Sequence, residues 1–130
     1  MDADKQKTPG YQLLIVDDES YVEKMQAMFK RRGIEAIWEE TGLLGVETYA
    51  QIKPDAVLLD YHLPDINGIE VFKKIKEIDP DVKVYFISAE PTPEIQDEAE
   101  RLGAKGFFMK PINLLSVMNI LLPNKNLNTT

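Results

Sequence analysis

AVLLD, at residues 56–60, is the stretch that decides the fold: four apolar residues followed by a carboxylate. An apolar run without polar alternation is typical of a strand that is covered on both faces in the middle of a parallel sheet. Pro64 and Gly68 then indicate a loop, and a helical pattern follows it. Asp60 is therefore predicted at the carboxyl end of a central strand, where open α/β sheets bind ligands. Taken alone, an aspartate there fits a turn or a helix cap equally well.

Strands and helices alternate along the rest of the chain. Short apolar runs predict five strands, over 11–16, 34–38, 55–60, 82–87 and 106–109. Helical spacing predicts five helices with these apolar positions: Val22, Met25, Met28, Phe29; Leu43, Leu44, Val46, Tyr49; Ile66, Ile69, Phe72, Ile75, Ile78; Ile95, Ala99, Leu102; Ile112, Leu115, Val117, Met118, Leu121. Because parallel neighbours need crossover elements, this order predicts an α/β fold: a doubly wound, five-stranded parallel sheet with helices on both faces.

The second predicted helix contains two features that act in opposite directions. Thr41 can cap its amino end. Gly42 and Gly45 weaken it, since a glycine inside a helix costs about 1 kcal/mol relative to alanine.

Composition narrows the class of protein. The 130 residues suffice for one domain, predicted over 11–122 between a flexible leader (1–10) and a flexible tail (123–130). A net charge of −7 argues against direct nucleic-acid binding, and the absence of cysteine excludes disulfides and thiolate metal sites. The acidic start is unlike a secretory signal, and no apolar stretch approaches the ~20 residues that span a bilayer. We therefore expect a cytoplasmic protein without membrane contacts.

Polar residues follow the predicted strand ends. Asp17 and Asp18 follow the first strand, Asp60 ends the third, and Ser88 and Lys110 follow the last two. Carboxyl ends of parallel strands lie at one edge of the sheet, so these side chains are expected to cluster. Two like charges about 4 Å apart repel by roughly 4 kcal/mol at an effective dielectric constant of 20. Three carboxylates must therefore take up protons or bind a cation, because Lys110 offsets only one charge.

The chemistry of this cluster suggests Mg²⁺ and phosphoryl transfer. Oxygen ligands select hard divalent ions, and Mg²⁺ suits a site with few protein ligands and a phosphate. In this hypothesis Asp60 is the nucleophile that forms an aspartyl phosphate, Lys110 neutralises charge on the phosphoryl oxygens, and Ser88 donates a hydrogen bond. Singly, these residues are more simply explained as helix caps, a surface lysine and a turn. Their coincidence at the strand ends favours the site.

As a set, these motifs resemble the receiver domain of two-component response regulators, over about residues 11–122. The motifs that stand in the family's order are Asp17-Asp18, the segment 60–65 with Gly68, Ser88-Ala89 and Lys110-Pro111. The resemblance implies the flavodoxin-like fold of that family.

The resemblance also implies roles for the site residues. Asp17, Asp18 or both would hold Mg²⁺, with Asp60 and the backbone carbonyl of His62 completing the protein ligands. Asp60 would take its phosphoryl group from a phosphohistidine donor. A cis peptide bond is implied between Lys110 and Pro111.

A switch follows from the same resemblance. Ser88 would move toward the phosphoryl group, and Phe107, three residues before Lys110, would rotate into the space behind it. A simple core role is the alternative for Phe107. His62 and Glu90 occupy positions that tune phosphoryl lifetime in the family. Serine replaces the commoner threonine at 88, and phenylalanine replaces the frequent tyrosine or histidine at 107.

Our leading hypothesis is a stand-alone, monomeric receiver, because no output module follows Pro123. It would act by protein contact, as a phosphorelay intermediate or as a diffusible chemotaxis-like regulator, and would catalyse only its own phosphorylation and dephosphorylation. Its expected partners are a sensor histidine kinase or histidine phosphotransferase and a downstream effector protein, with the apolar first helix as a docking surface. Alternatives are a receiver excised from a longer DNA-binding regulator and a Mg-dependent aspartyl-phosphate phosphatase. The phosphatase would need an acid where His62 stands. A flavin-binding module and a degenerate receiver that only binds partners are further alternatives, disfavoured by the acids and Lys110.

Overall fold

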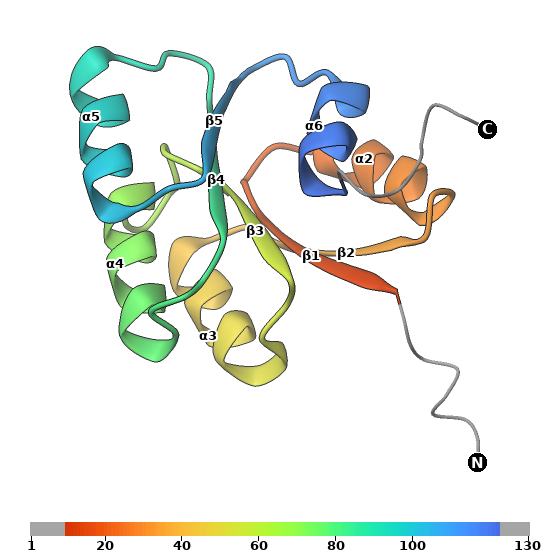
Figure 1. Ribbon diagram of the computed structural model, residues 1–130, viewed down its shortest axis with the longest axis horizontal. Helices are drawn as coiled ribbons and strands as arrows, with labels where there is room; N and C mark the ends of the chain where they lie inside the picture. The colour runs from red at the N-terminus through yellow and green to blue at the C-terminus, as the bar shows by residue number, and fades with distance from the viewer. Residues whose placement is uncertain (1–9, 123–130) are drawn as a thin grey trace.

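The computed structural model describes residues 10–122 as one sheet with helices on both faces (Figure 1). The strands are β1 (Tyr11–Val16), β2 (Ile34–Glu39), β3 (Ala56–Asp60), β4 (Val84–Ser88) and β5 (Gly106–Met109). The helices are α2 (Tyr21–Lys30), α3 (Gly42–Ile52), α4 (Gly68–Ile78), α5 (Pro93–Leu102) and α6 (Leu114–Leu121). Apart from Gly10, the predicted leader and tail lie outside the described residues. None of the described helices is long and apolar enough to cross a membrane.

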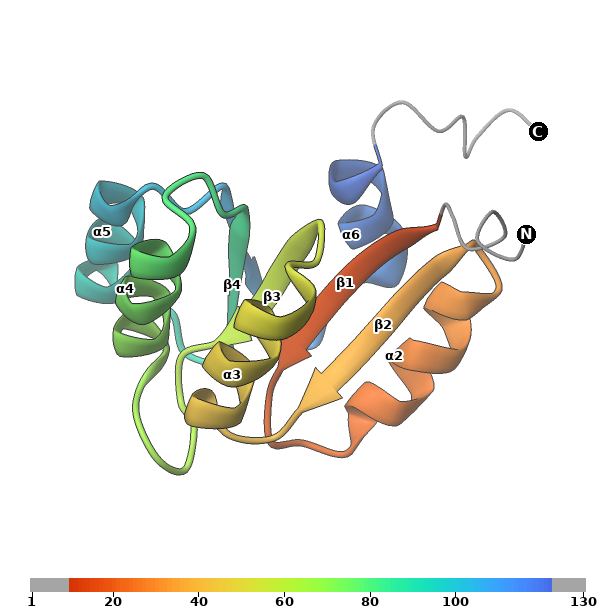
Figure 2. The same ribbon diagram turned by 90° about the horizontal axis from the view of Figure 1, so that it is seen from below.

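The strand order is β2-β1-β3-β4-β5, and every neighbouring pair is parallel. Helices α2 and α6 lie on one face of the sheet, and α3, α4 and α5 lie on the other (Figures 1 and 2). The predicted fold class, a doubly wound five-stranded parallel sheet, is confirmed. This order sets β1 beside β3, so the carboxyl ends of these two strands are adjacent.

Two apolar cores form on the two faces because successive residues of a strand point in opposite directions. Along β1, Leu13 and Ile15 join the core under α2 and α6, whereas Leu14 and Val16 join the core under α3, α4 and α5. All five residues of β3 are buried, as expected for a strand covered on both faces.

Several of the apolar residues on which the helix predictions rest do not lie in the core. Two of the predicted helices also begin later than expected: Ile66 and Ile112 precede α4 and α6, because Asn67 and Asn113 cap those helices. The apolar positions of the predicted helices that are at least one-third exposed are Met28, Leu43, Leu44, Ile78 and Leu115.

Helix α3 forms as predicted, but its buried face is not the one that its leucines indicate. Its buried residues are Gly42, Gly45 and Tyr49, spaced along one helix face, so Leu43 and Leu44 turn outward. A Cβ on Gly45 would lie 2.7 Å from Cγ2 of Val16 in β1, and one on Gly42 would lie 2.7 Å from Cγ2 of Val71. The two glycines therefore form the packing face of α3 and allow it to lie close to the sheet. Thr41 caps this helix as predicted, by accepting from the Leu44 N–H.

The chain also passes very close to the end of β3 at Gly68. The Gly68 N–H donates to the Tyr61 carbonyl at 2.8 Å, and a Cβ on Gly68 would lie 2.6 Å from the Asp60 carbonyl oxygen and 2.9 Å from the Tyr61 Cα. Both obstructing atoms belong to the backbone, so no side-chain rotation can make room.

Gly68→Ala should therefore destabilise the protein by about 1–3 kcal/mol, the usual range for overpacking. Urea unfolding measures the change. Gly10→Ala is the control, since its Cβ would meet only the Gly33 carbonyl at 3.5 Å, an ordinary contact. Equal stability of the two variants would contradict the close approach at Gly68.

Candidate functional site

Asp17 continues β1 by one residue, and both its N–H and its carbonyl are hydrogen-bonded. Its N–H donates to the Glu39 carbonyl at 3.1 Å, and its own carbonyl accepts from the Trp38 indole N–H at 2.7 Å. Both partners lie in β2, the neighbouring strand. The Asp17 side chain is fully buried, so a carboxylate is fixed at the sheet edge with little freedom to move.

Asp17, Asp18 and Asp60 form an acidic cluster at this edge. One carboxylate oxygen from each residue lies within 4.8 Å of the others. Asp17 and Asp60 are buried, whereas Asp18 is exposed and leaves the cluster open to solvent. Three converging carboxylate oxygens are a donor set that fits a hard divalent cation such as Mg²⁺. The structure thus brings together the three acids that the sequence placed at the strand ends.

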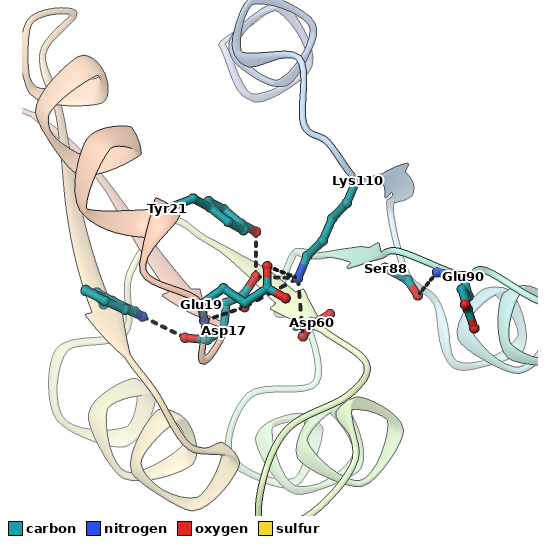
Figure 3. A network of polar contacts seen from close by, with 8 residues as sticks. Asp17, Glu19, Tyr21, Asp60, Ser88, Glu90 and Lys110 are labelled. Carbon is teal, nitrogen blue, oxygen red and sulfur yellow. Dashed lines mark hydrogen bonds and ion pairs between the residues drawn. The ribbon is translucent and has the colours of Figure 1, made fainter.

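Lys110 is the cation that faces this cluster (Figure 3). Its Nζ lies 3.1 Å from Oδ2 of Asp17 and 3.6 Å from Oδ2 of Asp60. The backbone N–H of Lys110 donates to the Ser88 carbonyl, which ties the end of β5 to β4. The Lys110–Pro111 peptide bond is cis, as the resemblance implied. Lys110 therefore reaches the acids from the sheet edge, across the end of β4.

Two residues of the network were missed in the sequence. Oε1 of Glu19 lies 3.3 Å from Lys110 Nζ, and the Tyr21 hydroxyl donates to Oδ2 of Asp17 at 2.5 Å. Glu19 could have been found as the third acid of the run that follows β1. Nothing in the sequence marks Tyr21, the first residue of α2, because its contact depends on how that helix leaves the sheet.

The charges in the cluster act on one another. Burial and the neighbouring Asp17 carboxylate raise the pKa of Asp60 from 3.8 to about 7, against the lowering effect of Lys110. Burial opposes the charge of Lys110, but the carboxylates of Asp17 and Asp60 outweigh it and raise the pKa of the lysine. In the absence of a bound cation, the neutral, protonated form of the Asp60 carboxyl is therefore favoured below about pH 7.

Ser88 lies at the end of β4 but does not join the ion-pair network. Its side chain is buried, and its hydroxyl oxygen accepts from the Glu90 N–H at 3.1 Å. Figure 3 shows this contact to one side of Lys110 and Asp60. A hydrogen bond from Ser88 to a phosphoryl group, and a role of Glu90 in phosphoryl lifetime, both stay predictions.

Phe107 and His62 occupy different environments. The Phe107 ring is half-buried and stacks on Phe86, with centroids 5.9 Å apart and planes 13° from parallel. A cavity of about 110 Å³ lies beside it, against residues of α5 that include Ala99. His62 is exposed, and its ring meets the Tyr61 ring edge-on at 4.8 Å. The switch role of Phe107 and the metal-binding role of the His62 carbonyl stay predictions.

Comparisons with known proteins agree with this architecture. The family model of the response regulator receiver domain matches residues 13–121. Chemotaxis protein CheY of Thermotoga maritima is 37% identical over 114 residues, which cover 86% of this chain and 95% of that protein. Sporulation initiation phosphotransferase F of Bacillus subtilis is 31% identical over 103 residues, covering 78% and 83%. The solved CheX-CheY-BeF3-Mg+2 complex from Borrelia burgdorferi matches with a TM-score of 0.82 and 28% identity, covering 92% of this chain and 91% of that one.

The raised pKa of Asp60 predicts a pH-dependent stability. Because the folded-state pKa of about 7 lies above the ordinary value of 3.8, the folded protein retains a proton that the unfolded chain has lost between these limits. Without a divalent cation, stability should therefore fall as pH rises from about 4 to about 7. Asp60→Asn should remove this fall and stabilise the protein at pH 8 by on the order of 1–3 kcal/mol, since one pKa unit corresponds to about 1.4 kcal/mol.

Urea unfolding in EDTA across this pH range measures the effect. Asp97→Asn is the control, because Asp97 is exposed on α5. If the stability of the Asp60→Asn variant followed the wild-type pH curve, the assignment of this pH dependence to Asp60 would be contradicted.

Proposed function

Because this chain belongs to the response regulator receiver domain family, we propose that Asp60 is its phosphoacceptor, with Lys110 and a Mg²⁺ ion as the groups that stabilise the transferred charge. The position of the Asp60 carboxylate is the observation that carries this proposal. It is buried at the end of the central strand, close to Lys110 and within reach of two further acids. Receiver domains signal through phosphorylation at an acidic site that binds Mg²⁺. The acidic cluster of this chain offers the carboxylate oxygens that such a site needs.

The transfer needs one bond to form and one to break. A carboxylate oxygen of Asp60 attacks the phosphorus of a phosphohistidine, the P–N bond breaks, and its electron pair returns to the imidazole nitrogen. Mg²⁺ would be held by Asp17, Asp18 and Asp60, with the His62 carbonyl as a further ligand, and would supply positive charge to the phosphoryl oxygens. Lys110 is already poised beside Asp60 and would pair with one of those oxygens.

The electrostatics of the site link metal binding to nucleophilicity. Only the ionised carboxylate of Asp60 can attack, and burial beside Asp17 raises its pKa to about 7. A divalent cation in the cluster would lower this pKa and increase the reactive fraction at neutral pH. The same acids that make the metal-free site unfavourable would thus make its activity depend on the cation.

The proposed switch begins at Ser88. Its buried hydroxyl oxygen accepts a hydrogen bond from the Glu90 N–H, and within residues 10–122 the hydroxyl donates to no other group, so its proton is available to a phosphoryl oxygen. When Ser88 moves toward the phosphoryl group, the Phe107 ring would turn into the space that Ser88 leaves. Residues His62 and Glu90, each two positions after a site residue, would tune the phosphoryl lifetime.

We propose a sensor histidine kinase or a histidine phosphotransferase as the phosphoryl donor, and a downstream effector protein as the receiver of the signal. The Borrelia burgdorferi complex pairs a CheY with CheX, which supports protein contact as the output. Catalysis would be limited to phosphorylation and dephosphorylation of the chain itself. The phosphatase alternative is not favoured by any observation, and His62 stands where such an enzyme would need a second acid.

Asp60→Asn should abolish phosphoryl uptake. Incubation with acetyl phosphate and Mg²⁺ should add the mass of one acid-labile phosphoryl group to the wild-type protein, and none to the variant, as measured by intact mass spectrometry. Removal of Mg²⁺ with EDTA should suppress the uptake by the wild type. Asp97→Asn serves as the control carboxylate and should retain uptake. Phosphorylation of the Asp60→Asn variant at the wild-type rate would reject Asp60 as the acceptor.

Lys110→Ala should uncouple phosphorylation from the change at Phe107. The variant should still acquire a phosphoryl group, more slowly, but the backbone amide shifts of β5 should no longer respond, as measured by NMR before and after phosphorylation. Lys73→Ala is the control, since Lys73 is exposed and its 4.0 Å pair with Glu98 lies at the surface. A wild-type response in the Lys110 variant would remove this lysine from the switch.

A further inference from the structure

Tyr21 contacts both an acid and the lysine of the site (Figure 3). Its hydroxyl donates to Oδ2 of Asp17 at 2.5 Å, and Lys110 Nζ lies 5.3 Å from the centre of its ring. Tyr21 is half-buried at the start of α2, so both contacts are fixed by the first turn of that helix. We propose that Tyr21 is a positioning residue that raises the affinity of the acidic cluster for Mg²⁺. This inference rests on the proposed function.

The hydrogen bonds of Asp17 show what Tyr21 adds. Oδ1 accepts from the Glu19 N–H at 3.0 Å, and Oδ2 accepts from Tyr21 and faces Lys110 at 3.1 Å. Lys110 divides its charge among three carboxylates, those of Asp17, Glu19 and Asp60. Within residues 10–122, Tyr21 is the one side chain that donates to Asp17 and to no other acid. Its phenol therefore sets the orientation of this carboxylate.

A neutral donor suits a cation site better than a charged one. Lys110 stabilises the carboxylate of Asp17, but its positive charge repels an incoming Mg²⁺. The Tyr21 hydroxyl fixes the same carboxylate and adds no charge. Burial and the hydrogen bond to Asp17 raise the pKa of Tyr21, so the phenol stays protonated and continues to donate. Hydrogen-bond partners of metal ligands commonly increase metal affinity 10–100-fold.

The ring of Tyr21 has a second effect. The ammonium group of Lys110 lies over its face, a contact that holds the lysine on the side of the acids. The same ring lines a groove of about 500 Å³ together with Met25 and Ile112. Lys110 and Glu19 of the charged network line the same groove. Tyr21→Phe would keep the aromatic wall and remove only the hydroxyl.

The test is a Mg²⁺ titration of Tyr21→Phe without any phosphoryl donor. Trp38, the only tryptophan of the chain, donates to the Asp17 carbonyl, so its emission reports on this loop. The NMR shift of the Glu19 amide, which donates to the Asp17 side chain, gives an independent reading. We expect the variant to bind Mg²⁺ about tenfold more weakly than the wild type. In phosphorylation by acetyl phosphate, the half-saturating Mg²⁺ concentration should rise similarly, while the rate at saturating Mg²⁺ stays unchanged.

Tyr49→Phe is a matched control. The Tyr49 hydroxyl donates to Oδ2 of Asp79 at 2.7 Å, the same type of bond at a distance from the site, on α3. This variant should lose some thermal stability and retain wild-type Mg²⁺ affinity. If Tyr21→Phe binds Mg²⁺ within twofold of the wild type, or more tightly, the positioning role is overturned. If the wild-type protein itself binds no Mg²⁺, the proposed function fails, and the two results are distinguishable.

Tyr21→Leu separates the ring from the hydroxyl. It should show the same loss of Mg²⁺ affinity, and in addition a lower phosphorylation rate at saturating Mg²⁺, because Lys110 loses the ring that holds it. A saturating rate equal to that of Tyr21→Phe would reject the role of the ring.

Discussion

Mutual repulsion among the carboxylates at the sheet edge is the constraint on which the site depends. Asp17 and Asp60 are both buried, and parallel pairing of β1 and β3 leaves them side by side. Burial weakens the screening that water would supply, so their charges interact strongly. Within residues 10–122, Lys110 is the cation that pairs with both of them. The charges of the described residues therefore do not balance at this edge, which favours the binding of a divalent cation there.

The surrounding backbone holds the acids against this repulsion. Gly68 lets the start of α4 approach the Asp60 carbonyl closely, and Gly45 lets α3 pack on Val16, the residue before Asp17. Asp65, in the loop after β3, accepts from the N–H groups of Gly42 and Leu43 at 2.8 Å. These hydrogen bonds lower the pKa of Asp65, although its slight burial acts in the opposite direction. The loop that follows Asp60 is thus fastened to the amino end of α3, and the geometry of the site is set before any ligand arrives.

How much of this could be read from the sequence depended on the type of contact. The strands were predictable because buried parallel strands are continuous apolar runs, and the acidic cluster followed because parallel strand ends share one edge. The packing face of α3 was not predictable, because Gly42 and Gly45, which form it, give no apolar signal in the sequence, whereas the outward-facing Leu43 and Leu44 do. Tyr21 was missed for a related reason: the reach of its hydroxyl to Asp17 depends on the angle at which α2 leaves the sheet.

Lys110 connects the resting site to the proposed reaction. In the structure its charge is shared among Asp17, Glu19 and Asp60, so none of them is neutralised fully. A divalent cation bound by the acids would neutralise part of their charge in place of Lys110, since the same carboxylate oxygens would then face a double positive charge. Lys110 would then be available to pair with the phosphoryl group on Asp60. The neutral hydroxyl of Tyr21 would keep its hydrogen bond to the Asp17 carboxylate while Lys110 moves from the acids to the phosphoryl group, so the two donors would have different roles.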